Sequence, residues 1–265
     1  MVQLNFRTKR NGVPILSKRE IEDLAEIVLI DYDKDLVYDP KPSALDIDEI
    51  VECYAGLEMD YQDLTHDQSI LGMTVFNDSY IPVYDAEEGV AKEIPVDKGT
   101  VLIDNSLLEE SQLKRGRFTL SHELSHWLLH RQIYTINPQQ LSLFDFEEDK
   151  PMIMCRTTDI ESNGRKELIT DDDWIEWQAD YMASTIIMPR RAFSKVARER
   201  FDELGIEGEF ERGSNFRLDL EVSSLIYDLS NIFDVSLSAA EIRLKNLGFI
   251  MEPLDYKQKM LSQLF

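Results

Sequence analysis

The sequence predicts an α+β fold, because short strand-like stretches come first and long helix-like stretches follow. The strand candidates are rich in β-branched or aromatic residues and are separated by turn residues such as Asn77-Asp78. They cover residues 57–61, 70–76, 81–84 and 100–103. Two later segments, 118–131 and 171–188, have the residue spacing of helices. Strands and helices that are segregated along the chain in this way are typical of an α+β domain.

The N-terminal part is expected to be an arm followed by two helices. Residues 1–16 predict a mobile arm. Ser17 and Glu20 then form a capping-box pattern, in which each side chain bonds a free amide of the first turn, so a helix is expected over 17–32. Apolar residues at helical spacing predict a second, shorter helix over 46–54.

The second half of the chain is expected to be mostly helical. Residues 132–170 are polar and lack sustained periodicity, so they predict an insertion with one hairpin near 152–157. Further helices are expected at 190–203, 218–232 and 237–247. We therefore expect one domain over 1–190, with the insertion inside it, and a C-terminal helical region over 191–265.

The charge of the chain limits its partners. Its 265 residues include 28 Lys and Arg against 51 Asp and Glu, a formal net charge of −23. Such a chain repels nucleic acid and anionic membranes, so we expect no direct nucleic-acid partner and no membrane association. The first residues show no apolar signal-peptide core, and Cys53 and Cys155 have no metal-like spacing. These features predict a cytoplasmic protein.

The segment 118–131 contains the pattern His122-Glu123-Leu-Ser-His126, of the form H-E-x-x-H. Its two histidines lie one helical turn apart, about 6 Å along the axis, so their imidazoles can converge on one ion. Glu123 points about 100° around the helix, where it can reach a water molecule without binding the metal. Zinc would supply Lewis acidity, and Glu123 would be the general base. The pattern predicts one Zn²⁺ per chain.

The position of the histidines on the helix also matters. They lie opposite an apolar stripe that includes Leu124, so we expect one helix face on the core and the histidine face beside a cleft. His130 is about 12 Å from His122 along the axis, which is too far to share one ion. His130 is therefore expected to pack or to form hydrogen bonds. A site made by His126 and His130 would place Trp127 where the base should be.

A third ligand has to come from elsewhere in the chain. Glu176 shares a helical face with Ala179 and Ala183. A carboxylate on such a small, apolar face is unfavourable unless it is paired or binds a metal. Asp180 is one turn further along and could accept the outer N–H of a ligating histidine. The alternative for Glu176 is a salt bridge on a buried helix.

Three stretches of the chain together resemble the ImmA/IrrE family of zinc metallo-endopeptidases. They are Arg117–His126 with H-E-x-x-H, Glu176–Pro189 with E-x-x-A-D and Met-Pro, and Phe233–Gly248 with Val-Ser-x-x-Ala. The resemblance implies a zincin-like fold and a cytosolic, repressor-like regulatory protein as the substrate. It also implies that His122, His126 and Glu176 are the zinc ligands and that Glu123 is the general base.

The sequence departs from the family in two places. Met182 stands where the family usually has Phe, which is a mild change in packing. The stretch between His126 and Glu176 is longer than usual, so an insertion there could cover the cleft.

Two other interpretations stay open. Phe233–Gly248 has the pattern of a helix-turn-helix, which would indicate a transcription regulator. Arg243 and Lys245 are its only basic residues, however, which is poor for phosphate contact. The second alternative is a metal-binding interaction module without turnover, and the presence of Glu123 argues against it.

Two features of substrate handling can also be predicted. Zincins hold an extended substrate against the edge strand of their sheet, and Thr100–Ile103 is the candidate strand beside the cleft. His130 and Tyr181 are candidates for stabilising the oxyanion.

Overall fold

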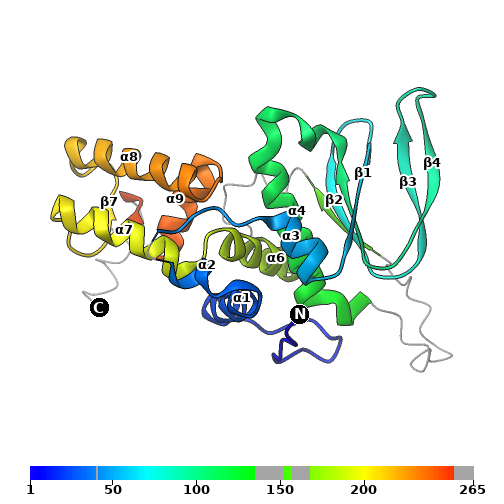
Figure 1. Cartoon of the computed structure of the whole chain (residues 1–265), viewed down its shortest axis with the longest axis horizontal. Coiled ribbons are helices and arrows are strands. Elements are labelled where there is room, and N and C mark those ends of the chain that lie inside the picture. Colours follow the sequence, from blue (N-terminus) through cyan, green and yellow to red (C-terminus); the bar gives the residue numbers. More distant parts are fainter. Residues whose placement is uncertain (40, 135–151, 157–167, 254–265) are drawn as a thin grey trace. The chain divides into compact units, whose positions relative to one another are not determined.

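The computed structural model describes residues 1–39, 41–134, 152–156 and 168–253 and confirms a mixed α+β protein (Figure 1). The chain divides into two compact units. The first contains Met1–Tyr32 and Asp46–Ile186, and the second contains Asp33–Leu45 together with the described residues from Ile187 onward. The segment 33–45 thus belongs to the same unit as the later helices. The predicted domain boundary at residue 190 placed this segment in the first domain.

The main sheet of the first unit has the strand order β1-β5-β2-β6. Its strands are β1 (Glu58–Gln62), β5 (Thr100–Asp104), β2 (Ile70–Val75) and β6 (Met152–Arg156). β1 and β5 are parallel, and the other two pairs are antiparallel. Every residue of β5 is buried, and the strand lies centrally between β1 and β2. The expectation that Thr100–Ile103 is an edge strand beside the cleft is therefore wrong.

A separate antiparallel pair consists of β3 (Ser79–Asp85) and β4 (Val90–Val96). β4 was not expected, because its mostly exposed sequence includes Lys92, Glu93 and Pro95. Its conformation follows from pairing with β3 along seven residues in a hairpin, which the composition of β4 alone does not indicate. β6 lies within the predicted insertion, but it extends the main sheet beside β2. The rest of the predicted hairpin, like residues 135–151 and 157–167, lies outside the described residues.

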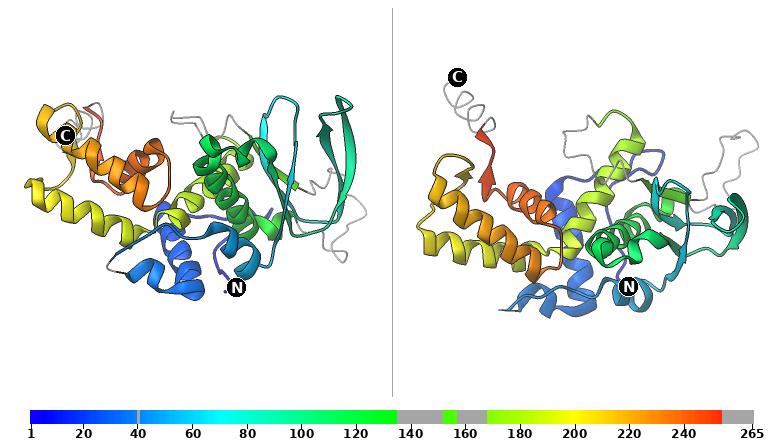
Figure 2. Two further views of the ribbon diagram at one scale, coloured as in Figure 1. Left: turned by 45° about the horizontal axis from the view of Figure 1, so that its top comes forward. Right: turned by 90° about the horizontal axis from the view of Figure 1, so that it is seen from above.

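The helices of the first unit follow the expected order. α1 (Lys18–Asp33) begins with the predicted capping box, since Ser17 N donates to Glu20 Oε2 at 2.8 Å and Glu20 N donates to Ser17 Oγ at 3.3 Å. The predicted helix over 46–54 is a short α3 (Ile47–Glu49) followed by a π-helical turn, Ile50–Tyr54. α4 (Leu113–Tyr134) carries the H-E-x-x-H residues and α6 (Asp171–Ile187) carries Glu176. The two helices are the green and yellow-green ribbons of Figure 2.

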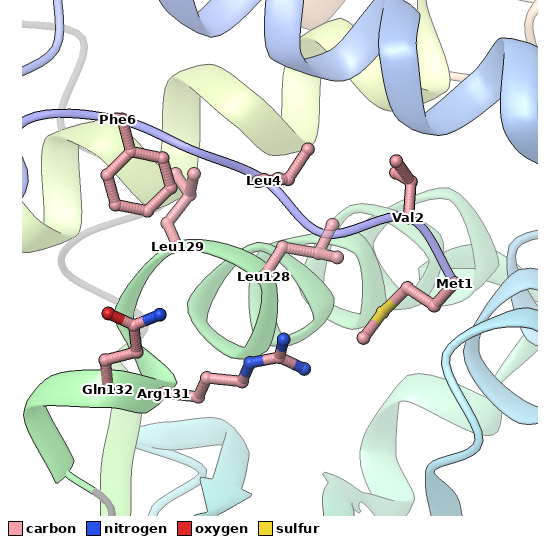
Figure 3. A pocket seen from close by; sticks show the side chains of 8 residues that line it. All are labelled: Met1, Val2, Leu4, Phe6, Leu128, Leu129, Arg131 and Gln132. Carbon is pink, nitrogen blue, oxygen red and sulfur yellow. The ribbon is translucent and has the colours of Figure 1, made fainter.

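The N-terminal arm is folded onto this unit by contacts that the prediction of a mobile arm did not include. Figure 3 shows the side chains of Met1, Val2, Leu4 and Phe6 around the same small pocket as Leu128 and Leu129 of α4. Further along, Val13 is buried, and Asn11 Nδ2 donates to Asp171 Oδ2 of α6 at 2.6 Å. Lys9 forms an ion pair with the same carboxylate. The arm thus contacts both α4 and α6.

The second unit is built from α2 (Asp35–Tyr38), α7 (Arg190–Leu204), α8 (Phe216–Ile232), α9 (Leu237–Asn246) and the short parallel pair β7 (Phe210–Glu211) and β8 (Ile250–Met251). Its core contains Phe193 and Phe233, whose rings lie 5.3 Å apart. Pairing of β7 with β8 joins the loop before α8 to the segment after α9.

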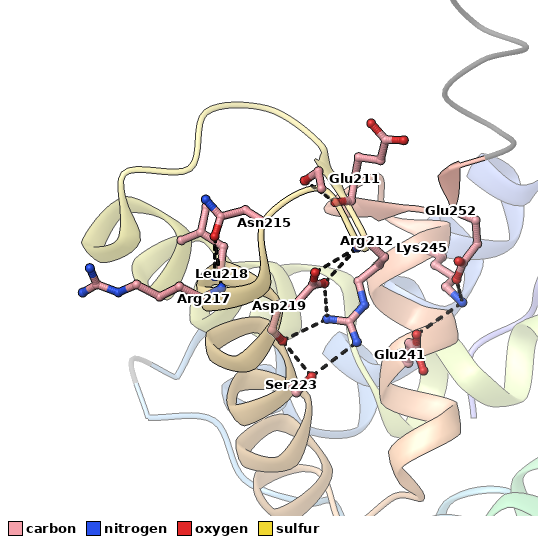
Figure 4. A network of polar contacts seen from close by, with 12 residues as sticks. Glu211, Arg212, Asn215, Arg217, Leu218, Asp219, Ser223, Glu241, Lys245 and Glu252 are labelled. Carbon is pink, nitrogen blue, oxygen red and sulfur yellow. Dashed lines mark hydrogen bonds and ion pairs between the residues drawn. The ribbon is translucent and has the colours of Figure 1, made fainter.

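The basic residues of the helix-turn-helix-like segment are engaged within this second unit. Arg243 is 1% exposed, and its Nε donates to Met188 O at 3.1 Å. Lys245 forms ion pairs with Glu252 at 2.6 Å and Glu241 at 3.4 Å (Figure 4). These contacts make both side chains poorly suited to bind phosphate, which weakens the interpretation of this segment as a DNA reader.

Candidate metal centre

α4 is covered on both sides where it carries the H-E-x-x-H residues. Gly72 of β2 lies against one side, since a Cβ built there would be 2.7 Å from Thr119 Cγ2. On the side of α6, Ser121 Oγ donates to Ala183 O at 3.2 Å. Small residues at these positions allow the close approach of the strand and the second helix. All residues from Thr119 to His126 are consequently buried.

Among the described residues, the two histidine side chains themselves are covered. His122 and His126 are 0% exposed. The exposed surface of the group belongs to α6, where the side chains of Glu176 and Asp180 are 19% and 35% exposed. The helical wheel could not show this, because it describes one helix and α6 covers the polar face of α4.

The structure brings His122, His126 and Glu176 together, with one possible ligand atom from each within 4.8 Å of the others. The two Nε2 atoms of the histidines are 2.8 Å apart. Glu176 Oε2 lies 3.3 Å from the first Nε2 and 3.7 Å from the second. Helix periodicity explains the histidine pair, and packing of α6 against α4 supplies the carboxylate.

Electrostatics around Glu176 suit a cation. Burial raises the pKa of this carboxyl, but His126 and His122 more than offset that effect and hold the pKa well below its usual range. Glu176 is therefore ionised. Its Oε2 is buried and has no hydrogen-bond donor among the described residues. Two imidazole nitrogens and a bare carboxylate oxygen are a donor set that fits a divalent metal ion.

The outer nitrogen of His122 is also bonded. Its Nδ1 is 2.8 Å from Asp180 Oδ1, the contact expected from the sequence. A carboxylate oxygen only accepts, so Nδ1 of His122 carries the hydrogen in this contact. This bond orients His122 for metal binding in the way that carboxylate partners of ligating histidines do.

Glu123 points to the sheet side of the histidines and is held by residues that the sequence analysis did not identify. Thr74 Oγ1 donates to Glu123 Oε2 at 2.6 Å. The other oxygen, Oε1, is buried without a hydrogen-bond partner among the described residues. Burial raises the pKa of Glu123. Gly72 leaves room for Oε1, because a Cβ there would be 2.9 Å from it.

A signal for these two residues was present in the sequence. Gly72 and Thr74 lie two apart in a strand of otherwise apolar residues, and alternate strand residues share a face. A glycine and a hydroxyl on one face of a buried strand indicate a close approach by another element.

Neither predicted oxyanion-binding residue is available for that role. His130 is fully buried, with Nδ1 3.0 Å from His126 Nδ1 and Nε2 3.1 Å from Gln178 Oε1. Burial lowers the pKa of His130 to about 3, so it is neutral. Tyr181 OH donates to Glu22 Oε1 of α1 at 2.9 Å. His130 is thus the hydrogen-bonding residue that the sequence predicted.

No protein-family model matches this chain, and no curated protein is significantly similar to it in sequence. The resemblance to the ImmA/IrrE peptidases therefore stays a prediction from motif residues. Within the part of the chain that the structure describes, no helix is both long and apolar enough to cross a membrane.

Proposed function

We propose that this protein is a cytosolic, zinc-dependent endopeptidase that cleaves a regulatory, repressor-like protein. The observation that supports this most strongly is the convergence of His122, His126 and Glu176 beside the partly unbonded carboxylate of Glu123. Two histidines and one glutamate with a position left open are typical of catalytic zinc sites in peptidases. The motif resemblance to the ImmA/IrrE family points to the same activity and substrate.

The roles of the protein groups follow from their contacts. Zinc, when bound, would polarise the scissile carbonyl and make a water molecule more acidic. Glu123 would take the proton at Oε1, because Oε2 is occupied by the Thr74 hydroxyl. Its raised pKa lets the carboxyl hold that proton and then release it to the leaving amine. Asp180 would keep His122 in its ligating orientation.

The substrate we propose has a basic or neutral segment at the cleaved bond. The chain's net charge of −23 attracts positively charged polypeptide and repels phosphate. An extended peptide could pair with an edge of the main sheet, whose described edge strands are β1 and β6.

The experiment that tests the function compares Glu123→Gln with the wild type. The variant is nearly isosteric but cannot accept a proton, so cleavage of a fluorogenic peptide library should fall by about 10²–10⁴-fold. Bound zinc, measured by elemental analysis, should stay at one per chain. Glu110→Gln changes an exposed carboxylate in the same way and should cleave like the wild type. Undiminished cleavage by Glu123→Gln would remove the proposed base.

The same variant can trap the substrate, since it should bind a protein that it cannot cut. Binding to random duplex DNA at low salt is the second measurement. Tight, salt-sensitive DNA binding with no captured protein would contradict the proposal and favour the transcription-regulator alternative.

A further inference from the structure

A line of buried polar atoms runs from the second histidine of the candidate centre to the N-terminal arm. His126 Nδ1 is 3.0 Å from His130 Nδ1, and His130 Nε2 is 3.1 Å from Gln178 Oε1. Gln178 Nε2 then donates to Pro14 O at 2.9 Å. The side chains of His126, His130 and Gln178 are at most 1% exposed. The line thus joins α4, α6 and the arm away from solvent.

The direction of the hydrogen bonds is fixed at the arm. The carbonyl of Pro14 can only accept, so Gln178 uses its NH₂ group there and presents Oε1 to the other side. This oxygen also only accepts, and His130 Nε2 must therefore carry a hydrogen. The side-chain amide of Gln178 could face Pro14 O with either its oxygen or its nitrogen, and only the nitrogen can donate to that carbonyl.

The hydrogen on His130 Nε2 determines the state of the next residue. No described carboxylate lies within hydrogen-bonding distance of His130, and a fully buried imidazole is neutral because burial disfavours its charged form. A neutral imidazole has one N–H, so Nδ1 of His130 accepts. The hydrogen between the two rings then belongs to His126 Nδ1, and His126 Nε2 is left bare.

We propose that His130 and Gln178 are positioning residues that hold His126 in the tautomer with a bare Nε2 before any metal binds. Asp180 does the same for His122. The two Nε2 atoms then face each other 2.8 Å apart as acceptors, with Glu176 Oε2 beside them and no hydrogen between them. These three atoms then form a donor set for one cation.

The inference rests on the proposed function for its metal site, but it does not depend on peptide cleavage. It assigns a role to His130, which cannot share an ion with His122, and to Gln178. We call the line from His126 through His130 and Gln178 to Pro14 O the relay. Because it ends at Pro14 O, the backbone of the arm becomes part of the metal centre. The ion pair of Lys9 with Asp171 and the hydrogen bond from Asn11 hold the arm in that place.

The test is ¹⁵N NMR of the metal-free, histidine-labelled protein, which distinguishes the two imidazole tautomers. His126 should carry its hydrogen on Nδ1 in the wild type. Gln178→Leu removes the acceptor for His130 Nε2–H, so His130 can carry its hydrogen on Nδ1 instead and donate it to His126 Nδ1. The His126 signal should then shift toward the Nε2–H tautomer. Burial keeps the new carboxyl of Gln178→Glu neutral, so it can donate its O–H to Pro14 O, offer its C=O to His130 and keep the wild-type pattern.

Zinc affinity, measured by competition with a chromogenic chelator, is the second readout. Gln178→Leu should weaken binding by about 10–100-fold, as expected for a partner of a metal ligand, and Gln178→Glu should stay close to the wild type. Urea unfolding of both variants shows whether either is simply unstable.

Each failure has its own signature. An Nε2–H tautomer of His126 in the metal-free wild type would overturn the relay. This measurement needs no variant, so it decides even if zinc binds and the variants do not fold. The expected tautomer and affinities without any peptide cleavage would leave the relay standing and remove the proposed endopeptidase.

Discussion

The two histidines of the candidate centre present the same atom to the same point, but their outer nitrogens meet opposite surroundings. His122 Nδ1 is bonded to the carboxylate of Asp180, whose side chain is 35% exposed. His126 Nδ1 is bonded to the neutral, fully buried His130. We refer to these two regions as the carboxylate side and the relay side of the centre.

Each histidine needs a partner that orients its ring toward the centre, and the kind of partner differs between the partly exposed side and the buried side. A carboxylate makes its histidine partner a better metal ligand, and at the carboxylate side water stabilises the charge of Asp180. A second carboxylate at the relay side would be a buried charge with a large desolvation penalty. Neutral groups that end at a backbone carbonyl orient His126 without that penalty, but each of them must be placed correctly.

The largest effect is expected for the proposed ligand that lies beside both histidines. Glu176→Ala should bind zinc at least about a hundredfold more weakly, because zinc binding of about 10–16 kcal/mol is shared among a few ligands. Both histidines should keep their tautomers in the metal-free protein, since their outer partners are unchanged. Chelator competition measures the affinity, with Glu110→Ala as the control. An unchanged affinity would show that Glu176 is not a ligand.

A smaller effect is expected where the sheet meets α4, on the side of Glu123. In Gly72→Ala, the new Cβ would lie 2.7 Å from Thr119 Cγ2 and 2.9 Å from Glu123 Oε1. Such overpacking of a core should lower the free energy of unfolding by about 1–3 kcal/mol in urea. Cleavage should also fall, because Glu123 has to move, while zinc affinity should change less.

The matched control for this substitution is Gly116→Ala on α4 itself. There the added Cβ is 3.3 Å from Leu107 O, and alanine favours a helix by about 1 kcal/mol over glycine. The unfolding free energy of this control should change little. Equal stability of Gly72→Ala and the wild type would mean that the strand and α4 are less closely packed than the structure indicates.

Sequence reasoning identified the carboxylate side well and the relay side poorly, and helix geometry explains why. His122 with His126, and Glu176 with Asp180, are four residues apart, so one periodicity predicts that each pair shares a face. The partner of His130 could not be found in this way. Gln178 belongs to another helix, and its position is confirmed only when Pro14, 164 residues away, accepts its hydrogen bond.

The fold shows the same limit. Helices and the capping box at Ser17 depend on residues close in sequence, and the predicted helix positions agree with the structure to within a few residues. The central place of β5, the addition of β6 to the sheet and the packed arm all depend on contacts between distant segments. Hydrophobic periodicity contains no information about such pairings, and those are the predictions that were wrong or incomplete.

The smallest effect, and the most direct test of the comparison, is the salt dependence of the two sides. Asp180→Asn keeps an acceptor for His122 Nδ1–H but removes a charge, so zinc affinity at low salt should fall by about tenfold. Raising the salt from about 0.01 to 1 M shortens the screening length from about 30 to 3 Å. Because Asp180 is partly exposed, this should narrow the gap in zinc affinity between Asp180→Asn and the wild type. The gap between Gln178→Leu and the wild type should stay constant, since no charge is removed there. Glu110→Gln controls for the loss of one negative charge elsewhere on the surface. If the two gaps respond equally to salt, the sides do not differ in the way proposed, and Asp180 acts as a neutral acceptor like His130.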